Sequence, residues 1–322
     1  MAKEISLGEN QRVDSPVDPK PSQEIVKPGP TSNNAELVQY LLNAPSDQLI
    51  PWEDCVLPSR GIYYHSLVPD GKVKVKPFTI NSEKIMSTSR LVQSGQSIDY
   101  VFKHHVKFPS NEFTQFDLLT GDWTYLFFFL RGISYGNEYE FSYTCPNEDC
   151  HRLNIYEYDL NQIQKVIKGP KHKEEPIKVI LPYQSKMMGR DVWVEVRFLR
   201  HKDLKEISKR EKNDKFIRRI GPKSASHDDS VIEFNDAIER HISLSVVSIL
   251  GVKDPITIQE VVKKFHCTDT EAIKQVVDDD APGFDSEITI KCPHCDNELK
   301  TLLPFTADFF RSKGSSATRR GV

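Results

Sequence analysis

Two pairs of cysteines constrain the fold of this chain more than any other feature of its sequence. The first pair lies in the stretch "FSYTCPNEDCHRLNIYEYDL", residues 141–160, and the second in "ITIKCPHCDNELKTLLPF", residues 288–305. In both stretches a proline directly follows the first cysteine, and strand-like segments flank the turn. Each stretch is therefore predicted to be a strand, a cysteine-bearing turn and a second strand.

The spacing of the four cysteines favours one shared metal ion. Cys145 and Cys150 are separated by four residues, and Cys292 and Cys295 by two. A turn of this kind, here called a knuckle, directs two thiolates at one point and supplies half of a tetrahedral site. Four sulfur ligands at about 2.3 Å suit Zn²⁺ and leave no open position for a substrate, as in structural zinc sites. Iron at the same thiolates, free cysteines, or a disulfide within each knuckle are the alternatives, and a reducing cytoplasm disfavours the disulfides.

The remaining cysteines and the nearby histidines are weaker candidates for ligands. Cys55 and Cys267 are expected to be half-buried small apolar residues rather than ligands or nucleophiles. His151 and His294 adjoin the knuckles, where either could replace a thiolate or orient the ligands by hydrogen bonding. Because four cysteines already complete a tetrahedral site, neither histidine is assigned to the metal.

Length and charge exclude several classes of protein. A chain of 322 residues with 38% hydrophobic and 28% charged residues can bury a substantial core, and we expect two compact units with extensions. The formal net charge of −3 argues against general affinity for nucleic acid, which requires a basic footprint. The opening "MAKEISLGENQRVDSPVDPKP" has no apolar segment typical of a secretory signal, so we expect synthesis in a cytoplasm.

The fold class predicted from these patterns is α+β, with mixed helices, short antiparallel hairpins and a zinc-ribbon-like clip of four cysteines that joins the two halves. The first half comprises a Pro- and Ser-rich arm, disordered or ordered by a partner, followed by an α+β unit with a strand, helices capped by Asn81 or Ser82, and the first knuckle. The predicted boundaries are 1–34 for the arm, 35–160 for the unit, 71–80 for the strand and 81–135 for the helices.

The second half begins after a charged linker. A hairpin formed by residues 177–183 and 192–199 is predicted to lead into helices, including one in which Phe234, Ile238, Ile242, Val246, Ile249 and Leu250 share an apolar face. Two short helices are expected near 257–265 and 269–278. The predicted boundaries are 161–176 for the linker, 177–287 for the hairpin with its helical insertion, 288–311 for the second knuckle hairpin and a terminal helix, and 312–322 for a basic tail.

The most apolar run, "WTYLFFFL" at 123–130, is hydrophobic on all sides. Its eight residues fall far short of the ~20 that cross a bilayer. We predict a helix buried in the core, with docking against a partner as the alternative. This run and the cluster of Phe305, Phe309 and Phe310 are the expected places where the core continues into an interface.

Motifs of common enzymes do not occur in the sequence. It contains no G-x-x-x-x-G-K-[ST], G-x-G-x-x-G, G-x-S-x-G or H-E-x-x-H pattern, and no Gly-rich loop leads into a helix. The acidic run at 278–280 precedes a Pro-Gly turn and is interpreted as a solvated turn rather than a two-metal site. We therefore expect no catalytic activity.

Several short motifs resemble one family of viral proteins. The segments "VLPSRGIYY" (56–64), "KVKVKPFTINSEKIM" (72–86), "LPY…GRDVWVEVRFLRHKDLKEI" (181–207) and "KCPHCDNELKTLLPFTADFF" (291–310) are similar to the baseplate hub proteins of T4-like contractile-tailed bacteriophages. The resemblance covers about residues 55–310. The arm, the C-x₄-C spacing of the first knuckle and the long insertion between knuckles depart from the expected pattern.

The resemblance implies a non-catalytic structural component of the tail baseplate. Its partners would be other baseplate, tail-tube or spike proteins and copies of itself in a ring. It would be assembled in the host cytoplasm and reside in the virion, without contact to a membrane or nucleic acid.

A zinc-ribbon accessory factor of viral transcription or replication is the alternative function. The paired knuckles and the basic runs "KREKNDKFIRR" (209–219) and "RSKGSSATRRGV" (311–322) favour this interpretation. Against it stand the acidic balance and the lack of aromatic residues in those basic runs beyond Phe216, since single-stranded nucleic acids stack on aromatic side chains.

Overall fold

The computed structural model of the chain divides into two compact units, Met1–Pro51 and Trp52–Val322. In the first unit, α1 (Asn34–Asn43) and the short α2 (Ser46–Leu49) follow one another. Asn33 caps α1, because its side chain accepts a hydrogen bond from the backbone N–H of Glu36 at 2.9 Å. The described residues are 27, 29, 32–88, 90–91, 95–209, 237–284, 286–304 and 309.

The second unit begins with a small antiparallel sheet of β1 (Glu53–Val56), β2 (Lys72–Val75) and β3 (Val106–Lys107). The 3-10 helices η1 (Ile62–Leu67) and η2 (Pro69–Gly71) connect β1 to β2. In β2 the valines are buried and the lysines exposed, as the alternation in the sequence predicts. The strand is shorter than the predicted 71–80, because Pro77 has no N–H to continue the ladder.

Three helices build most of the first core: α3 (Ile80–Ser87), α5 (Gln96–His105) and α6 (Thr120–Tyr135). The predicted cap of α3 at Asn81 or Ser82 is wrong. Thr79 is the cap residue, and its hydroxyl accepts from the Ser82 N–H, while Asn81 and Ser82 lie inside the first turn. The prediction that residues 123–130 form a buried helix is confirmed, since most of this run in α6 is buried.

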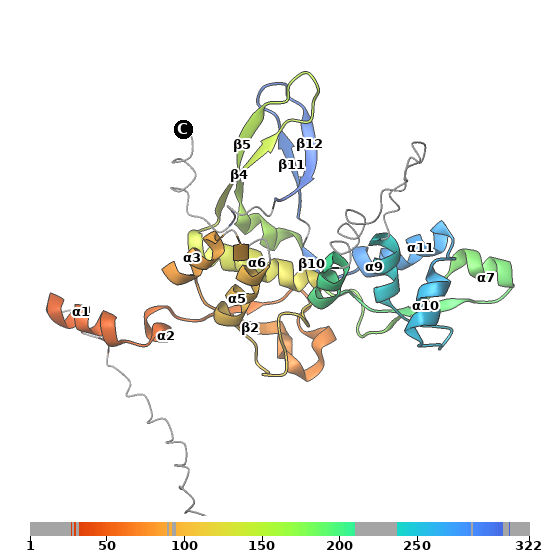
Figure 1. The fold of residues 1–322 in the computed structure, drawn as a ribbon, viewed down its shortest axis with the longest axis horizontal. Coiled ribbons are helices and arrows are strands. Elements are labelled where there is room, and N and C mark those ends of the chain that lie inside the picture. Colours follow the sequence, from red (N-terminus) through yellow and green to blue (C-terminus); the bar gives the residue numbers. More distant parts are fainter. Residues whose placement is uncertain are drawn as a thin grey trace, which may run out of the picture. The chain divides into compact units, whose positions relative to one another are not determined.

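Two long hairpins carry the knuckles. β4 (Glu138–Thr144) pairs with β5 (Leu153–Asp159), and β11 (Glu287–Lys291) pairs with β12 (Glu298–Leu302). Figure 1 shows the two hairpins side by side, projecting together from the helices. The hairpins at 138–144 and 152–158 and at 288–305 were both expected from the sequence, and the structure confirms their existence.

The segments next to the hairpins also meet. After β5 the chain forms the 3-10 helix η3 (Leu160–Val166) and the short strand β6 (Ile167–Lys168), so the predicted linker has secondary structure of its own. β6 pairs antiparallel with β10 (Gly283–Phe284), which lies just before β11. β10 also packs on α6 at Gly121, where an added Cβ would lie 2.0 Å from the Pro282 carbonyl oxygen.

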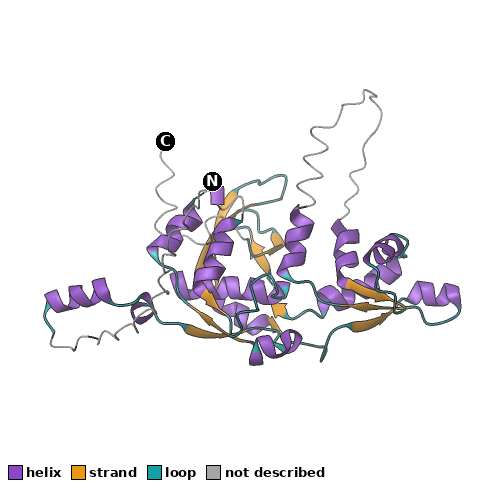
Figure 2. Ribbon diagram, turned by 60° about the horizontal axis from the view of Figure 1, so that its bottom comes forward, coloured by secondary structure: helices purple, strands orange, loops and turns teal. Residues whose placement is uncertain are grey.

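Between β6 and β10 the chain builds a second module. Its sheet has the order β7 (Ile177–Ile180), β8 (Trp193–Val196), β9 (Val246–Ile249), all antiparallel. Figure 2 shows these strands with helices packed along them. The helical elements are α7 (Pro182–Met188), residues 201–209, α9 (Ala237–Ser245), α10 (Pro255–Val262), α11 (Cys267–Lys274) and the π-helical η4 (Gln275–Asp279).

The sequence predicts one helix with an apolar face from residue 234 to residue 250, and this prediction is wrong beyond Ser245. The chain changes there to β9, because the β-branched residues Val246 and Ile249 pair with β8 instead of continuing the helix. Ile242 and Val246 are buried as expected, whereas Ile238 is 49% exposed. Phe234 lies outside the described residues.

The second unit has two hydrophobic cores. The second core lies wholly within the second module, from Val179 to Val277. The first core combines residues 55–163 with Phe198 of the second module and with Ile288, Leu303 and Phe309 from the other end of the chain. Phe309 is fully buried and stacks on Phe127 with a centroid distance of 5.6 Å, so it is a core residue rather than an interface residue.

Some sequence-based predictions fall outside the described part of the chain. These are most of the 1–34 arm, the basic tail at 312–322, Phe305 and Phe310, and most of the proposed terminal helix. The domain boundaries given above stay predictions. Among the described residues, no helix is long and apolar enough to cross a membrane.

Candidate metal centre

The first knuckle continues the ladder of the β4–β5 hairpin. Cys145 directly follows β4, and its N–H donates to the Arg152 carbonyl at 2.9 Å, which closes the turn. Within the turn, the N–H of Cys150 donates to the Asn147 carbonyl at 2.9 Å. His151 adopts the left-handed conformation (φ 43°) directly after the second cysteine. The backbone therefore turns back on itself with both thiols on the same side.

The second knuckle repeats this construction with a tighter turn. Cys292 directly follows β11, and its N–H donates to the Asn297 carbonyl at 2.9 Å. Asp296 directly follows Cys295, donates to the Cys292 carbonyl at 3.0 Å and has φ 58°. The residue after the second cysteine is thus left-handed in both knuckles. The equivalence of the two stretches in the sequence reflects an equivalence of their backbones.

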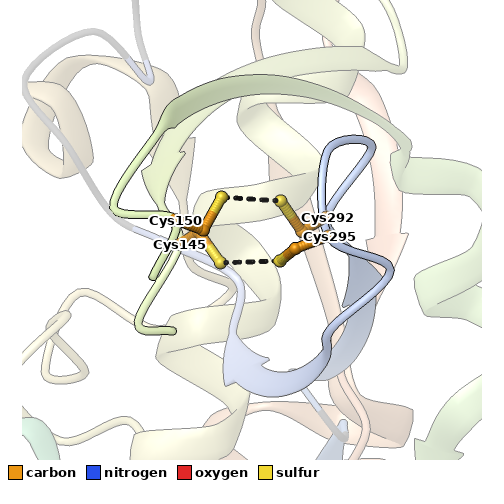
Figure 3. Close-up of side chains that lie close together, drawn as sticks. All are labelled: Cys145, Cys150, Cys292 and Cys295. Carbon is orange, nitrogen blue, oxygen red and sulfur yellow. Dashed lines mark hydrogen bonds between the residues drawn. The ribbon is translucent and has the colours of Figure 1, made fainter. Parts of the chain in front are cut away.

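The structure brings all four predicted cysteines together. The Cys145 and Cys295 Sγ atoms are 3.6 Å apart, and the Cys150 and Cys292 Sγ atoms are 3.8 Å apart. All four sulfurs lie within 4.8 Å of one another. Figure 3 shows each short S···S contact running from one knuckle to the other.

These distances fit a tetrahedral metal site and not a disulfide. Four sulfurs at about 2.3 Å from a central Zn²⁺ would be about 3.8 Å apart along each edge of the tetrahedron. A disulfide would need about 2.05 Å, and all six cysteines of the chain are free. Both short contacts match the tetrahedral edge. The four cysteines could therefore bind one metal ion at the centre of the cluster.

Backbone amides favour the thiolate form at the second knuckle. The N–H groups of His294 and Cys295 are directed at the Cys292 sulfur and lower the pKa of this thiol to about 6. The Asn154 side chain, itself buried, donates to the same sulfur at 3.4 Å. A thiolate is the form that binds a metal, so this environment prepares a ligand.

Four thiolates cannot share this space without a cation. The Asn297 N–H favours the thiolate of Cys295, but burial and the neighbouring thiols outweigh it and raise the pKa of Cys295 to about 12. The pKa of Cys145 is also raised, although the Asn147 N–H favours its thiolate. A divalent metal ion would supply the positive charge that allows all four groups to ionise together.

The structure assigns the two histidines to the surroundings of the cluster. His294 Nδ1 lies 3.0 Å from the Arg152 guanidinium, which can only donate, so Nδ1 accepts the hydrogen bond. This contact links one knuckle to the other. His151 is exposed. The group of potential ligands found among the described residues consists of the four cysteines alone.

The two remaining cysteines are not part of the cluster. Cys55 is 1% exposed, and burial raises its pKa to about 12, so it is a small core residue and more deeply buried than expected. Cys267 is exposed at the start of α11. Sequence reasoning missed Asn154 and Arg152. Asn154 could have been identified from the sequence. It is a polar residue on the inward face of β5, the same face as Tyr156 and Tyr158, where an apolar residue would be expected.

A pair resembling a catalytic dyad occurs elsewhere but is sealed from solvent. Ser82 Oγ lies 2.5 Å from His105 Nε2, and His105 Nδ1 lies 2.9 Å from the Lys76 carbonyl oxygen. Ser82 and His105 are only 2% and 3% exposed, and burial lowers the pKa of His105. This arrangement joins α3, α5 and the end of β2 and offers no access to a substrate.

A second buried polar network is centred on Asp122. This carboxylate accepts from the Ser59 N–H at 2.9 Å and from the Tyr64 hydroxyl at 2.5 Å. Burial raises the pKa of Asp122 to about 6 although these two donors favour its ionised form. The Tyr64 hydroxyl in turn accepts from the Leu119 N–H at 2.8 Å. The network fixes the start of α6 to the turn after β1.

Comparison with models of known protein families identifies a match. A family model described as "T4 bacteriophage base plate protein" matches residues 62–311, a span that includes both knuckles, the whole second core and most of the first. No curated protein matches the chain. No solved structure matches it either.

Proposed function

The chain belongs to the T4 bacteriophage base plate protein family, and from this premise we propose that it is a structural subunit of the baseplate hub. In this role it acts in tail assembly through protein–protein contacts, and one structural zinc ion bound by the paired knuckles stabilises its fold. The observation that carries the proposal is the family match over residues 62–311, well over half of the chain.

The geometry of the cysteine cluster supports the zinc ion. Four sulfurs with S···S contacts of 3.6 and 3.8 Å fit Zn²⁺ at about 2.3 Å from each. Cys145, Cys150, Cys292 and Cys295 would all be ligands, so no position remains for a substrate or water. Zinc would therefore have a structural and not a catalytic role. Iron fits the same ligands and is the alternative that metal analysis distinguishes.

The position of the cluster in the chain explains why such an ion would be useful. Cys150 and Cys292 are 142 residues apart in sequence, and the second module lies between them. Ile288 and Leu303, on either side of the second knuckle, pack into the first core with residues from the first half. An ion shared by the two knuckles would hold together the two hairpins between which the second module is inserted, and would keep Ile288 and Leu303 in the first core.

A baseplate subunit needs surfaces for its neighbours and no catalytic pocket. We propose that the partners are other baseplate proteins, tail-tube or spike proteins, and copies of this chain in a ring. Assembly would occur in the host cytoplasm, and the final location would be the tail of the virion. Absence of catalysis is part of the proposal, supported by the burial of the Ser82–His105 pair.

The zinc-ribbon function in transcription or replication gains no support from the knuckle surface. The turns of the two knuckles carry the carboxylates of Glu148, Asp149 and Asp296, which would repel phosphates. Two basic residues flank the turns: Arg152 contacts His294, and Lys291 pairs with Asp296 at 3.3 Å. Assembly is therefore the function proposed for this chain.

An amber mutation in the corresponding phage gene tests the function. Lysates of a non-suppressing host should contain filled heads but no complete tails, while DNA replication and late gene expression proceed normally. Supplying the wild-type chain from a plasmid should restore the tails, which is the control for effects on neighbouring genes. Normal tails together with a defect in transcription would refute the proposed function and favour the nucleic-acid-binding alternative.

A further inference from the structure

The four sulfurs of the cysteine cluster form two close pairs, and each pair joins one knuckle to the other. Cys145 Sγ lies 3.6 Å from Cys295 Sγ, and Cys150 Sγ lies 3.8 Å from Cys292 Sγ. Both S–H···S contacts of the cluster therefore run between the knuckles, as the dashed lines in Figure 3 show. These two pairs are here called the cross-knuckle pairs.

A disulfide within either cross-knuckle pair requires only a small movement. The bonded S–S distance is about 2.05 Å, so the two sulfurs of each pair would have to approach by about 1.6–1.8 Å. Small rotations about the Cα–Cβ bonds of both cysteines provide this approach, and the backbone can stay in place. The fold therefore holds two pairs of thiols in positions from which both pairs can be oxidised.

Solvent reaches one cysteine of each cross-knuckle pair. Cys150 and Cys295 are half-buried, whereas Cys145 and Cys292 are buried. A small oxidant thus meets an accessible cysteine in each pair, and the buried partner lies next to it. This combination is typical of a peroxide-sensitive cysteine beside a cysteine that resolves the oxidised intermediate.

Contacts that need no metal ion keep the two knuckles together. The Asn154 side chain of the first hairpin donates to the Cys292 sulfur of the second at 3.4 Å, and the Arg152 guanidinium donates to His294 at 3.0 Å. At the base of the second hairpin, Ile288 is buried in the first core. The cross-knuckle pairs should therefore stay close together when the thiolates hold no ion.

We propose that oxidation replaces the metal clip by a covalent clip of two disulfides, one between Cys145 and Cys295 and one between Cys150 and Cys292. The inference rests on the proposed function, because a virion subunit leaves the reducing cytoplasm at lysis and enters an oxidising medium. The cysteines would thus be free to bind the ion during assembly, and would be oxidised only in the released particle.

The chemistry balances with hydrogen peroxide as the oxidant. One peroxide molecule oxidises the thiolate of Cys150 or Cys295 to a sulfenic acid, and the second oxygen of the peroxide leaves as water after protonation. The sulfur of the buried partner then attacks the sulfenic sulfur, so that an S–S bond forms, the S–O bond breaks and another water leaves. Formation of both disulfides from four thiolates consumes two peroxide molecules and four protons and produces four water molecules. No thiolate remains to hold a divalent ion, which is released.

Only disulfides between the knuckles preserve the clip. Cys145 and Cys295 are 150 residues apart in sequence, and the second module lies between the two knuckles. A disulfide inside one knuckle would close a turn of a few residues and leave the two hairpins unconnected. A cross-knuckle disulfide closes a long loop instead, and long loops restrict the unfolded chain most. The released particle would therefore keep its hairpins joined after losing the ion.

Titration of the full-length chain, purified with zinc under reducing conditions, with hydrogen peroxide tests the inference. Non-reducing SDS gel electrophoresis should show a faster band, because the closed loop makes the denatured chain more compact, and dithiothreitol should restore the original mobility. Mass spectrometry should find peptides of one knuckle joined to peptides of the other. A zinc indicator should register one ion released for about two peroxide molecules consumed.

Two variants control the change in mobility, and circular dichroism before oxidation verifies that each is folded. Cys267→Ser removes the exposed cysteine outside the cluster and should behave like the wild type. Cys145→Ser/Cys150→Ser keeps the cysteines of the second knuckle alone, so its band should not shift. A shift in this folded double variant would assign the disulfide to a cysteine outside the cluster and would overturn the proposal. The peptide map of the wild type decides the question if the double variant does not fold.

Other products of the wild type would also overturn the proposal. These are disulfides inside each knuckle with unchanged mobility, sulfinic or sulfonic acids without any disulfide, and zinc that stays bound in excess peroxide. A chain that binds no zinc but forms both cross-knuckle disulfides would support the inference and refute the zinc clip of the proposed function. The amber phenotype tests the assembly function independently of all these outcomes.

Discussion

The free energy of unfolding should increase with the logarithm of the free zinc concentration. The slope of this dependence is proportional to the number of zinc ions bound by each folded chain. A ligand that binds only the folded state stabilises it by RT ln(1 + [L]/Kd). For one ion per chain, the free energy of unfolding should therefore rise by about 1.4 kcal/mol for each tenfold increase in free zinc above Kd. At 100 and 1,000 times Kd the total gain should be about 2.7 and about 4.1 kcal/mol.

We expect the stabilisation by zinc to appear in the main unfolding transition, because the second knuckle is attached to the first core. Ile288 and Leu303 flank the second knuckle and are 6% and 3% exposed in the first core, and Phe309 beyond them is fully buried. The knuckle hairpin therefore cannot detach without disrupting the core that both halves share. For a domain of this size the melting temperature should rise by about 3–6 °C per tenfold increase in free zinc.

Urea unfolding in zinc buffers provides the assay, with Cys295→Ser as the test variant. Elemental analysis should find that the variant has lost most of its zinc. Its free energy of unfolding should not change with the free zinc concentration. Cys267→Ser is the matched control, because Cys267 is an exposed cysteine outside the cluster, and its slope should equal that of the wild type. A wild-type slope of zero, a slope twice as large, or stoichiometric zinc in a Cys145→Ser/Cys150→Ser variant would refute one ion shared by the two knuckles.

Three further predictions follow from buried contacts. Because burial raises the pKa of Asp122 from 3.8 to about 6, the folded state binds the extra proton, and its stabilisation should be lost as the pH rises from about 4 to 6. Asp122→Asn should remove up to about 3 kcal/mol of this pH dependence in unfolding titrations, and an unchanged profile would contradict the assignment. Gly121→Ala should cost about 1–3 kcal/mol, because its Cβ would meet the Pro282 carbonyl, whereas Gly169→Ala, with open space around it, should be neutral in the same denaturation assay. Phe309→Ala should lower the free energy of unfolding by about 3–5 kcal/mol, and a cost below 1 kcal/mol would show that the ring is not part of the first core.

The knuckles were readable from the sequence because their signal is local. Proline after the first cysteine and strand-like flanks predict two similar turns, and residue chemistry predicts that their thiols share an ion. The alternation of Val73 and Val75 with lysines similarly placed β2. Turns and alternating strands of this kind can be predicted because residues close together in the sequence determine them.

Features that depend on distant partners were not readable. The apolar spacing of residues 238–250 fits a helix. Val246 nevertheless begins a strand, because β8 offers a partner with which it can pair. The pairing of β6 with β10 involves only two residues on each strand, too few for a sequence pattern. Phe309 looked like a terminal aromatic near an interface, yet its contacts with Phe127 and Tyr139 come from far along the chain.

A density map of the assembled phage tail tests the central claim most directly. The account predicts that this chain is found in the hub region of the baseplate, with one strong peak equidistant from the sulfurs of Cys145, Cys150, Cys292 and Cys295. A map in which the complete baseplate lacks this chain would contradict the assembly function. A map that contains the chain with the four sulfurs apart, or with separate ions at each knuckle, would contradict the shared metal clip.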